Sequence, residues 1–279
     1  MSFDLMTLAR QGRGPLRYAR PVWKALVRFR LPVVRPLWAV VFGVRPVLRR
    51  LGKLAAKLLW REPMLRYRCE DVGEGLYLEG PIPQIIGDGR IRIGRDVRIG
   101  NRTTFIVGFK VSEGAELVIG DRVSVNYQTT ISVAKSVRIG DDTMIAGNVQ
   151  IYDNISHPLS PARRLRHDSF TLDESSPVVI GRNCWIGNAA IIMRGVTIGD
   201  NSVVAAGSIV TKSVPPNVLV AGNPARVVRR RFDERTSERL AALAWWNWSH
   251  EALQTALPDF RKLGAEAFLD KYERTKVPA

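Results

Sequence analysis

The sequence has few cysteines and few histidines. Its 279 residues include two cysteines, Cys69 and Cys184, which lie in different parts of the chain. No disulfide framework is therefore expected, and a reducing compartment is the default. Three histidines occur in all, so a metal site with several imidazole ligands is not expected.

Long hydrophobic runs are also lacking. The apolar run from Pro36 to Val44 has about half of the roughly 20 residues that a membrane-spanning helix needs. Basic residues interrupt every apolar run near the N-terminus, and no small-residue cleavage site follows one. A signal peptide is not expected, and the protein is expected to stay in the cytoplasm.

Charge is uneven along the chain. Residues 1 to 66 contain 15 basic and two acidic residues, a net charge of +13, and the remainder contains 27 basic and 24 acidic residues, a net charge of +3. The excess therefore belongs to one segment. No nucleic-acid-binding motif accompanies it, so nucleic acid is not an expected partner.

The basic segment is also rich in Trp and Pro. Pro21 to Phe29 is expected to form a short amphipathic helix and Pro46 to Trp60 a second one, with the apolar run between them. Helices with Trp, Phe and Leu on one side and Arg or Lys on the other suit the headgroup region of an anionic membrane. Packing of the same faces on the rest of the protein, or on a neighbouring subunit, is an equally open interpretation.

Aliphatic residues recur at intervals of six in the second half of the chain. They are Ile180, Ile186, Ile192, Ile198, Val204 and Val210. A helix repeats near 3.6 residues and a half-buried strand near 2, so neither explains this period. Because a six-residue segment cannot bury its own apolar face, stability must come from one turn stacking on the next. The spacing predicts a coil of short strands and corners, with one aliphatic side chain inside each.

The repeat begins earlier and is interrupted once. Ile99, Ile119 and Ile139 are each followed by Gly and stand 20 residues apart, which fits a turn of three hexapeptides with two extra residues at a corner. Residues 152 to 177 have no six-residue pattern and are polar, basic and proline-bearing. A loop of this length in a compact repeat fold is usually functional or disordered.

Four motifs carry a family resemblance. They are Ile180-Gly-Arg-Asn-Cys-Trp-Ile-Gly-Asn188, Gly195-Val-Thr-Ile-Gly-Asp200, Ala205-Ala-Gly-Ser-Ile-Val-Thr-Lys212 and Ala221-Gly-Asn-Pro-Ala-Arg226. They resemble the hexapeptide-repeat acetyltransferases of the galactoside, maltose and nodulation type. Trp245-Trp-Asn-Trp248 resembles the C-terminal extension of the xenobiotic branch, which acts on chloramphenicol and streptogramin.

The resemblance implies a mainly β protein with a left-handed parallel β-helix, usually trimeric, that uses acetyl-CoA and no metal. We accordingly expect three parts. Residues 1–66 form a basic amphipathic helical segment, residues 67–231 form the β-helix with its loop at 152–177, and residues 232–279 form a C-terminal helical extension.

His157 is the expected general base. Acetyl transfer from a thioester to a hydroxyl needs a base that takes the hydroxyl proton, and a neutral imidazole can do so near pH 7. His157 follows a regular turn of the coil and precedes Pro158, which matches the His-Pro of the sugar acetyltransferases. His167 is expected to face solvent or an anionic part of the acceptor, and His250 to serve at an interface or a cap.

The resemblance also implies the residues that hold acetyl-CoA. Trp185 matches the aromatic position beside the acetyl end, and Asn188 matches a position near the thioester where Ser is more common. The whole expected set is Asn126, Trp185, Asn188, Ala206, Thr211, Lys212, Arg226 and Arg229. Asn126 has an alternative interpretation as a corner residue in the left-handed region.

Two further features have structural interpretations. Cys184 is the fifth residue of a hexapeptide, where small side chains turn inward, so we expect a packing role and no nucleophile. The tryptophans of the Trp245–Trp248 motif are expected to anchor a helix to the coil or to the next subunit, with a ligand platform as the alternative.

The acceptor is expected to be a hydroxyl of a sugar or polysaccharide precursor. Ser132-Val-Ala-Lys-Ser136 lacks the carboxylates that hold the sugar in the galactoside branch, and the loop is shorter than in the xenobiotic branch. A xenobiotic hydroxyl and a non-catalytic scaffold at the membrane surface remain as alternatives. A zinc hydratase, as in a related solenoid family, would need three histidine ligands.

Overall fold

The computed structural model describes residues 28–29, 35–109 and 114–275, and the chain divides into two compact units, residues 1–54 and 55–279. Most of the helix expected at Pro21–Phe29 lies outside the described residues. No described helix combines the length and the apolar content that crossing a bilayer requires.

A single helix replaces the expected apolar run and second helix. Helix α3 spans Arg35–Ala56 with Pro46 inside it, and the chain continues as η1 (Lys57–Arg61) and α4 (Glu62–Arg68). The expected start of a second helix at Pro46 is therefore wrong. Proline fixes φ near the helical value and removes a single donor, so a helix can pass through it with a kink.

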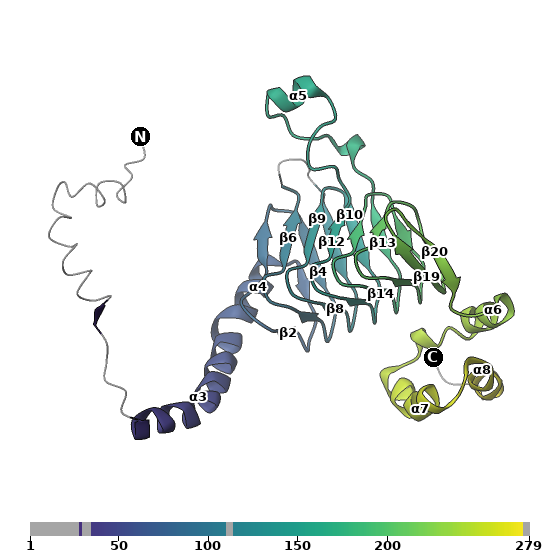
Figure 1. Ribbon diagram of the computed structural model, residues 1–279, viewed down its shortest axis with the longest axis horizontal. Helices are drawn as coiled ribbons and strands as arrows, with labels where there is room; N and C mark the ends of the chain where they lie inside the picture. Colours follow the sequence, from purple (N-terminus) through teal and green to yellow (C-terminus); the bar gives the residue numbers. More distant parts are fainter. Residues whose placement is uncertain (1–27, 30–34, 110–113, 276–279) are drawn as a thin grey trace. The chain divides into compact units, whose positions relative to one another are not determined.

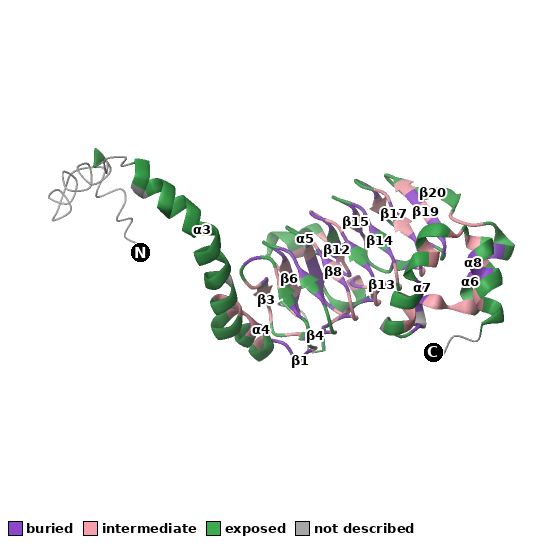
Figure 2. Ribbon diagram, turned by 90° about the horizontal axis from the view of Figure 1, so that it is seen from below, coloured by how far each residue is buried: buried purple, intermediate pink, exposed green. Residues whose placement is uncertain are grey.

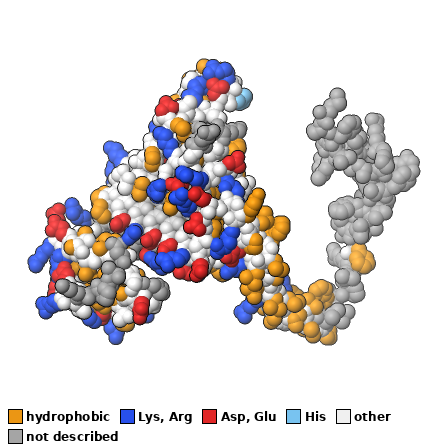
Figure 3. All heavy atoms as spheres, turned by 180° about the vertical axis from the view of Figure 1, so that it is seen from behind, with side chains coloured by type: hydrophobic (Ala, Val, Ile, Leu, Met, Phe, Trp, Pro, Cys, Tyr) orange, Lys and Arg blue, Asp and Glu red, His pale blue; other side chains and the backbone are white. Residues whose placement is uncertain are grey.

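Both sides of α3 are exposed up to Leu54. Val40, Val44, Val47 and Leu51 are spaced by four, three and four residues, which places them on one side of the helix. All four side chains are exposed. Figure 3 shows hydrophobic side chains gathered along this helix.

Three sheets of short strands form the coil (Figure 1). The first contains β1 (Asp71–Val72), β4 (Arg90–Ile93), β7 (Glu116–Ile119), β10 (Ser136–Ile139), β13 (Val178–Ile180) and β16 (Thr197–Ile198). The second contains β2 (Tyr77–Leu78), β5 (Arg98–Ile99), β8 (Ser124–Val125), β11 (Met144–Ile145), β14 (Trp185–Ile186), β17 (Val203–Val204), β19 (Val218–Gly222) and β20 (Ala225–Arg230). The third contains β3 (Gln84–Ile86), β6 (Thr104–Val107), β9 (Thr130–Val133), β12 (Gln150–Tyr152), β15 (Ile191–Ile192) and β18 (Ile209–Val210).

The chain visits the three sheets in turn, and its strands pair in parallel with those of the next turn. In the first sheet, for example, Ile139 pairs with Ile180, which pairs with Ile198. Among the strands of the described residues, β19 and β20 alone pair antiparallel, and this pair ends the coil. The fold is a left-handed parallel β-helix, as expected.

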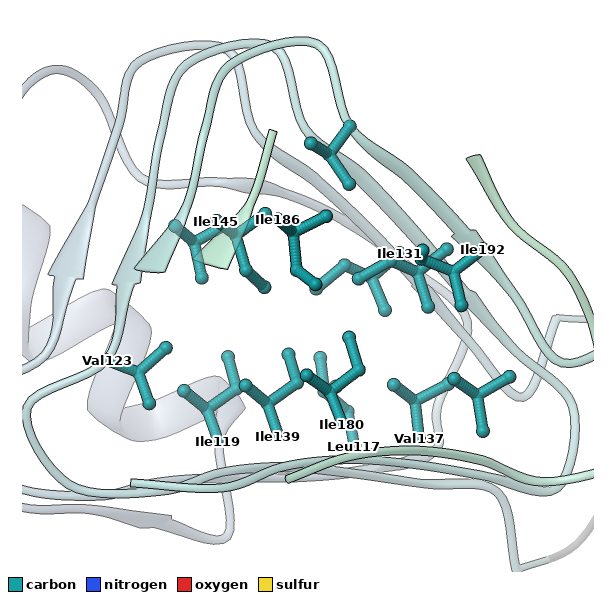
Figure 4. Packing of buried hydrophobic residues seen from close by; sticks show 14 of the residues in the cluster. Leu117, Ile119, Val123, Ile131, Val137, Ile139, Ile145, Ile180, Ile186 and Ile192 are labelled. Atoms are coloured by element: carbon teal, nitrogen blue, oxygen red, sulfur yellow. The ribbon is translucent and has the colours of Figure 1, made fainter. Parts of the chain in front are cut away.

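The six-residue period fills the interior of the coil. The six aliphatic residues from Ile180 to Val210 are each at most 1% exposed. Figure 4 shows the isoleucines and valines of the three sheets pointing into the space between them, and Figure 2 shows buried positions repeating along the coil. Burying one such side chain stabilises the fold by about 1.5–3 kcal/mol, so the stacked rows are its main source of stability.

The C-terminal extension is helical and has its own core. It contains α6 (Glu234–Leu243), η3 (Trp245–Asn247), α7 (His250–Lys262) and α8 (Ala265–Arg274). The ring of Trp245 lies 4.8 Å from that of Phe260, and the ring of Trp248 lies 5.0 Å from that of Tyr272. Trp245 and Trp248 thus pack on aromatic residues of the extension itself, and the expectation that the tryptophans anchor a helix to the coil or to the next subunit stays a prediction.

Candidate active site

A loop leaves the coil at the edge between the third and first sheets. It follows β12, carries α5 (Pro161–Leu165) and η2 (Leu172–Glu174), and returns at β13. Figure 1 shows α5 at the far end of this loop, away from the sheets. The amide of Ser176 donates to the carbonyl of Asp153 at 2.7 Å, so the two stems of the loop meet.

Asp153 anchors the first stem. Its carboxylate is fully buried and accepts hydrogen bonds from the backbone amides of Ala134 (2.7 Å), Lys135 (2.6 Å) and Ser136 (2.9 Å). Burial raises the pKa of Asp153, and the amide donors oppose this effect because they stabilise the charged form. The loop is thereby fixed to the turn between β9 and β10.

Asn154 continues the anchor toward His157. Its side-chain nitrogen Nδ2 donates to the hydroxyl of Ser132 at 3.0 Å. Its side-chain oxygen Oδ1 accepts from the backbone amide of Ser156 at 3.0 Å. Ser156 has a φ of +61°, and the His157 amide donates to the Ile155 carbonyl at 2.7 Å. The stem therefore turns tightly from the buried Asp153 and Asn154 to Ser156 and His157, which are exposed.

The outer part of the loop is held by its own ion pairs. Arg163 pairs with Glu174 at 3.1 Å, and Arg166 pairs with Asp168 at 2.8 Å. Arg164 donates to the carbonyls of Pro158 and Leu159. His167 is exposed, as expected for a residue that faces solvent.

A second group of expected residues lies at the edge between the second and third sheets. Asn188 and Ala206 take the same corner position in successive turns, since the Gly207 amide donates to the Asn188 carbonyl. Asn126 lies two turns before Asn188. In the strand register it aligns with Gly187, the residue before Asn188. The structure therefore brings these three residues to one edge.

Asn126 is not in the left-handed region. The corner residue with positive φ in its turn is Gln128, at +57°. The side-chain amide of Asn126 donates to the Ile145 carbonyl at 3.0 Å, which joins it to the next turn. The alternative interpretation of Asn126 is therefore wrong.

Trp185 stands on the outer face of the second sheet. It pairs with Met144 of the preceding turn and Val203 of the following one. Trp185 is 54% exposed, whereas the next residue, Ile186, is fully buried. A large apolar side chain is therefore open to solvent here. An exposed indole next to the Asn188 edge is suited to contact a ligand.

The remaining expected residues lie elsewhere. Thr211 and Lys212 follow β18, at the edge between the third and first sheets, where the His157 loop also emerges. Arg226 and Arg229 are exposed on β20, the last strand of the second sheet. Within this chain the set is thus divided between two edges and one sheet face, and His157 does not share an edge with Asn126 and Asn188.

Cys184 has the packing role expected of it. The residue is 2% exposed, and burial raises the pKa of its thiol to about 11. Its backbone amide donates to the Thr143 hydroxyl at 3.0 Å. A thiol in this state is a poor nucleophile. Within the described part of the chain, no cluster of three His, Cys, Asp or Glu side chains could hold a metal ion.

Sequence analysis missed Asp153, Asn154 and Tyr127. The ring of Tyr127 is half-exposed and lies against Gly147, in the corner row that continues to Asn188. The available signal for Asp153 and Asn154 was their place shortly before the Ser156-His-Pro158 sequence of the loop. Nothing in a single sequence distinguishes such a buried carboxylate from the many polar residues of a surface loop.

Comparison with known proteins finds a matching repeat and several similar acetyltransferases. The family described as "Hexapeptide repeat of succinyl-transferase" matches residues 177–212. Galactoside O-acetyltransferase of Escherichia coli is 45% identical over 122 residues, 44% of this chain and 58% of that protein. A solved galactoside acetyltransferase in complex with coenzyme A is 32% identical over 63% of this chain and 72% of that one, with a TM-score of 0.40. The chain therefore contains a hexapeptide repeat and is similar to acetyltransferases over part of their length, 58% in the case of the galactoside O-acetyltransferase.

Two other similarities extend along more of the coil. Chloramphenicol acetyltransferase from Escherichia coli is 29% identical over 213 residues, 72% of this chain and 99% of that protein. The N-acyltransferase AntD from Bacillus cereus has a TM-score of 0.51 at 20% identity, over 66% of this chain and 95% of that one. This second likeness shows the fold.

Proposed function

We propose that the protein transfers the acetyl group of acetyl-CoA directly to a hydroxyl of a sugar or polysaccharide precursor, with His157 as general base. The observation that carries this proposal is the placement of His157, an exposed imidazole at the end of a buried and hydrogen-bonded loop stem on the side of the coil. Similarity to acetyltransferases supports acetyl-CoA as the donor.

The chemistry needs no covalent enzyme intermediate. The acceptor hydroxyl oxygen attacks the thioester carbonyl while the neutral imidazole takes the hydroxyl proton. The tetrahedral intermediate then expels the coenzyme A thiolate, which recovers a proton from the imidazolium. A general base at this step accelerates transfer by about 10² to 10⁴.

A homotrimer completes the site in this proposal. His157 lies at one edge of the coil, and Asn126 and Asn188 lie at another. A neighbouring coil that packs against the first would bring the imidazole of one protomer beside the donor-binding residues of the other. Closed rotational symmetry forms the same interface three times. Trp185 and Asn188 then contact the acetyl end, Ala206, Thr211 and Lys212 border the pantetheine and phosphates, and Arg226 and Arg229 pair with phosphate oxygens.

The direct test is turnover with acetyl-CoA. Release of the coenzyme A thiol should accelerate when hydroxyl-bearing acceptors such as nucleotide sugars or glycan fragments are added, and mass spectrometry should detect a product heavier by one acetyl unit. Acetyl-CoA that binds without any transfer to such acceptors contradicts the sugar assignment. A titration in which acetyl-CoA does not bind favours the non-catalytic scaffold.

A xenobiotic hydroxyl is the second candidate acceptor. It is favoured by the similarity to chloramphenicol acetyltransferase, which covers nearly all of that relative. Chloramphenicol and sugar acceptors should be compared at equal concentration in the same assay. A higher kcat/KM for chloramphenicol would replace the sugar assignment.

We also propose that α3 lies on an anionic membrane. Its exposed apolar row, from Val40 to Leu51, is accompanied by Arg45, Arg49 and Arg50 on other sides of the helix. Helical spacing places these three arginines away from the apolar row, as in interfacial helices, and leaves Phe42 on their side, where its ring contacts Arg45. Each basic residue near an anionic surface contributes about 1 kcal/mol.

Flotation with anionic vesicles tests the membrane proposal. The full chain should float with vesicles, and Val44→Asp/Leu51→Asp should stay in the dense fraction. Gly43→Asp/Gly52→Asp is a matched control, because it adds the same two charges at exposed positions with open space around them. Equal flotation of both double variants would contradict a role for the apolar row.

A further inference from the structure

The first stem of the loop contains a carboxylate at a core position. Tyr152 pairs with Ser132, so Asp153 is in register with Val133, which itself pairs with Val107. Both valines are buried in the coil, at 0% and 2% exposure. The third sheet thus replaces a buried valine with a charged group at the point where the loop begins.

Coil stability does not explain this replacement. A buried carboxylate pays a desolvation penalty, and a valine at such a position avoids it. The penalty is offset here by three backbone amides and by the side chain of Asn154, which donates to Asp153 Oδ1 at 3.0 Å. These bonds fix the loop stem to the preceding turn, so the charged group stabilises one conformation of the stem.

Asn154 transmits this fixed position to the next residues. It donates to both the carbonyl and the hydroxyl of Ser132, and it accepts from the amide of Ser156. Ser156 adopts a left-handed φ of +61°, a conformation that a residue with a side chain rarely takes without such support. The backbone that leads to His157 is therefore set by side chains that are at most 3% exposed.

We propose that Asp153 and Asn154 are positioning residues that hold His157 where it can accept the acceptor proton, an inference that rests on the proposed function. They need not touch substrate. Proton transfer depends steeply on the placement of the base, and a displacement of about 1 Å can cost about 10²-fold in rate. The residues proposed to contact the acetyl end of the donor, Trp185 and Asn188, lie on another face and edge of the coil, so the effect should fall on kcat.

Asn154→Ala is the main test. It removes the acceptor for the Ser156 amide together with the bonds to Ser132. The variant should lower kcat about 10- to 100-fold while the KM for acetyl-CoA stays within about twofold. Asn154→Ser keeps a hydroxyl that can accept from the amide two residues on, more weakly than Asn does, and should recover part of the lost kcat.

A buried asparagine elsewhere in the coil serves as control. Asn201 is 3% exposed and accepts a side-chain hydrogen bond from Asn183 at 2.8 Å. Asn201→Ala should lower thermal stability as Asn154→Ala does, and leave kcat within about twofold of wild type. A fall in kcat common to both alanine variants would mean that lost stability, and not base placement, causes it, and would overturn the positioning role.

The inference and the proposed function fail in different ways. If His157→Ala is inactive and Asn154→Ala keeps wild-type kcat, the positioning role is wrong and the function stands. If His157→Ala keeps wild-type kcat, the proposed function itself is wrong. Loss of kcat in Asn154→Ala with partial recovery in Asn154→Ser supports both.

Discussion

The ring of Tyr127 lies directly against Gly147, which occupies the same corner position one turn later. A methyl group at Gly147 would stand 2.6 Å from two ring carbons. Asn188 follows Gly147 in this row of corners, and Asn126 precedes Tyr127 in the chain. The ring therefore belongs to the edge that contains Asn126 and Asn188, the residues proposed to bind the donor.

Gly147→Ala should displace the Tyr127 ring. The ring is half-exposed and can rotate outward, so we expect the variant to lose about 1 kcal/mol of stability, at the lower end for overpacking. Movement at this edge should raise the KM for acetyl-CoA several-fold. Gly264→Ala, at a position with open space, is the control and should leave the KM unchanged. An unchanged KM in Gly147→Ala would show that this edge does not hold the donor.

The two thiols should be inert. Burial raises the pKa of Cys69 and of Cys184 to about 11 each, so little thiolate exists near neutral pH. Incubation of the folded protein with iodoacetamide at pH 7.5 should leave turnover intact, and mass spectrometry should find both cysteines unmodified. Cys184→Ala should cost about 1–2 kcal/mol of stability and retain activity. Inactivation that tracks alkylation of Cys184 would contradict its packing role.

Trp185→Ala should weaken donor binding without unfolding the coil. The side chain is 54% exposed, so its removal should change stability by about 0.5 kcal/mol or less. If the indole contacts the acetyl end of the donor, the Kd for acetyl-CoA should rise about tenfold. Met144→Ala, at the exposed partner position one turn earlier, is a matched control. Calorimetric titration of both variants measures the difference, and equal affinities would remove Trp185 from the donor site.

The C-terminal extension should loosen in acid. Arg239 on α6 donates to Asp270 at 2.6 Å and to Glu273 at 2.7 and 3.0 Å on α8. These bonds lower the pKa of both carboxyls, so their stabilising contribution is present above the unfolded values near 4 and is lost as the pH falls through the lower folded values. Hydrogen exchange in α8 should therefore increase below about pH 4.

Removing the guanidinium should remove this pH dependence. Arg239→Ala should show fast exchange in α8 at neutral pH and little further increase in acid, whereas Arg261→Ala, with the same charge change on α7, should behave like wild type. The account of this contact is wrong if Arg239→Ala retains the wild-type acid transition.

The coil was predictable from the sequence because its period is visible in single residues. Ile180 and the five aliphatic residues that follow it at intervals of six are all buried, and the break in the repeat coincides with the loop before β13. The spacing of apolar residues follows which positions are buried, so it can be read from the sequence without knowing any contact. The sequence predicts the start of a helix at Pro46, but this residue lies inside one. A single proline therefore does not mark a helix boundary when the residues on both sides are helical.

The candidate site was predictable only in part. His157 and Trp185 were identified because their neighbours match family motifs. Asp153 and Asn154 were not, because their contacts are with Ser132 and the 134–136 turn, about 20 residues earlier, and only the coil register brings these segments together. The division of the expected residues between two edges also follows from that register and from no sequence pattern.

Subunit complementation tests the central claim most directly. His157→Ala subunits and Asn126→Ala/Asn188→Ala subunits should each assemble into trimers with little activity. Mixed trimers should regain activity, to about a quarter of the wild-type value if subunits assort at random, because some interfaces then join an intact His157 to an intact donor edge. Verified mixed trimers that stay inactive, or His157→Ala trimers with full activity, would contradict a site shared between protomers with this histidine as its base.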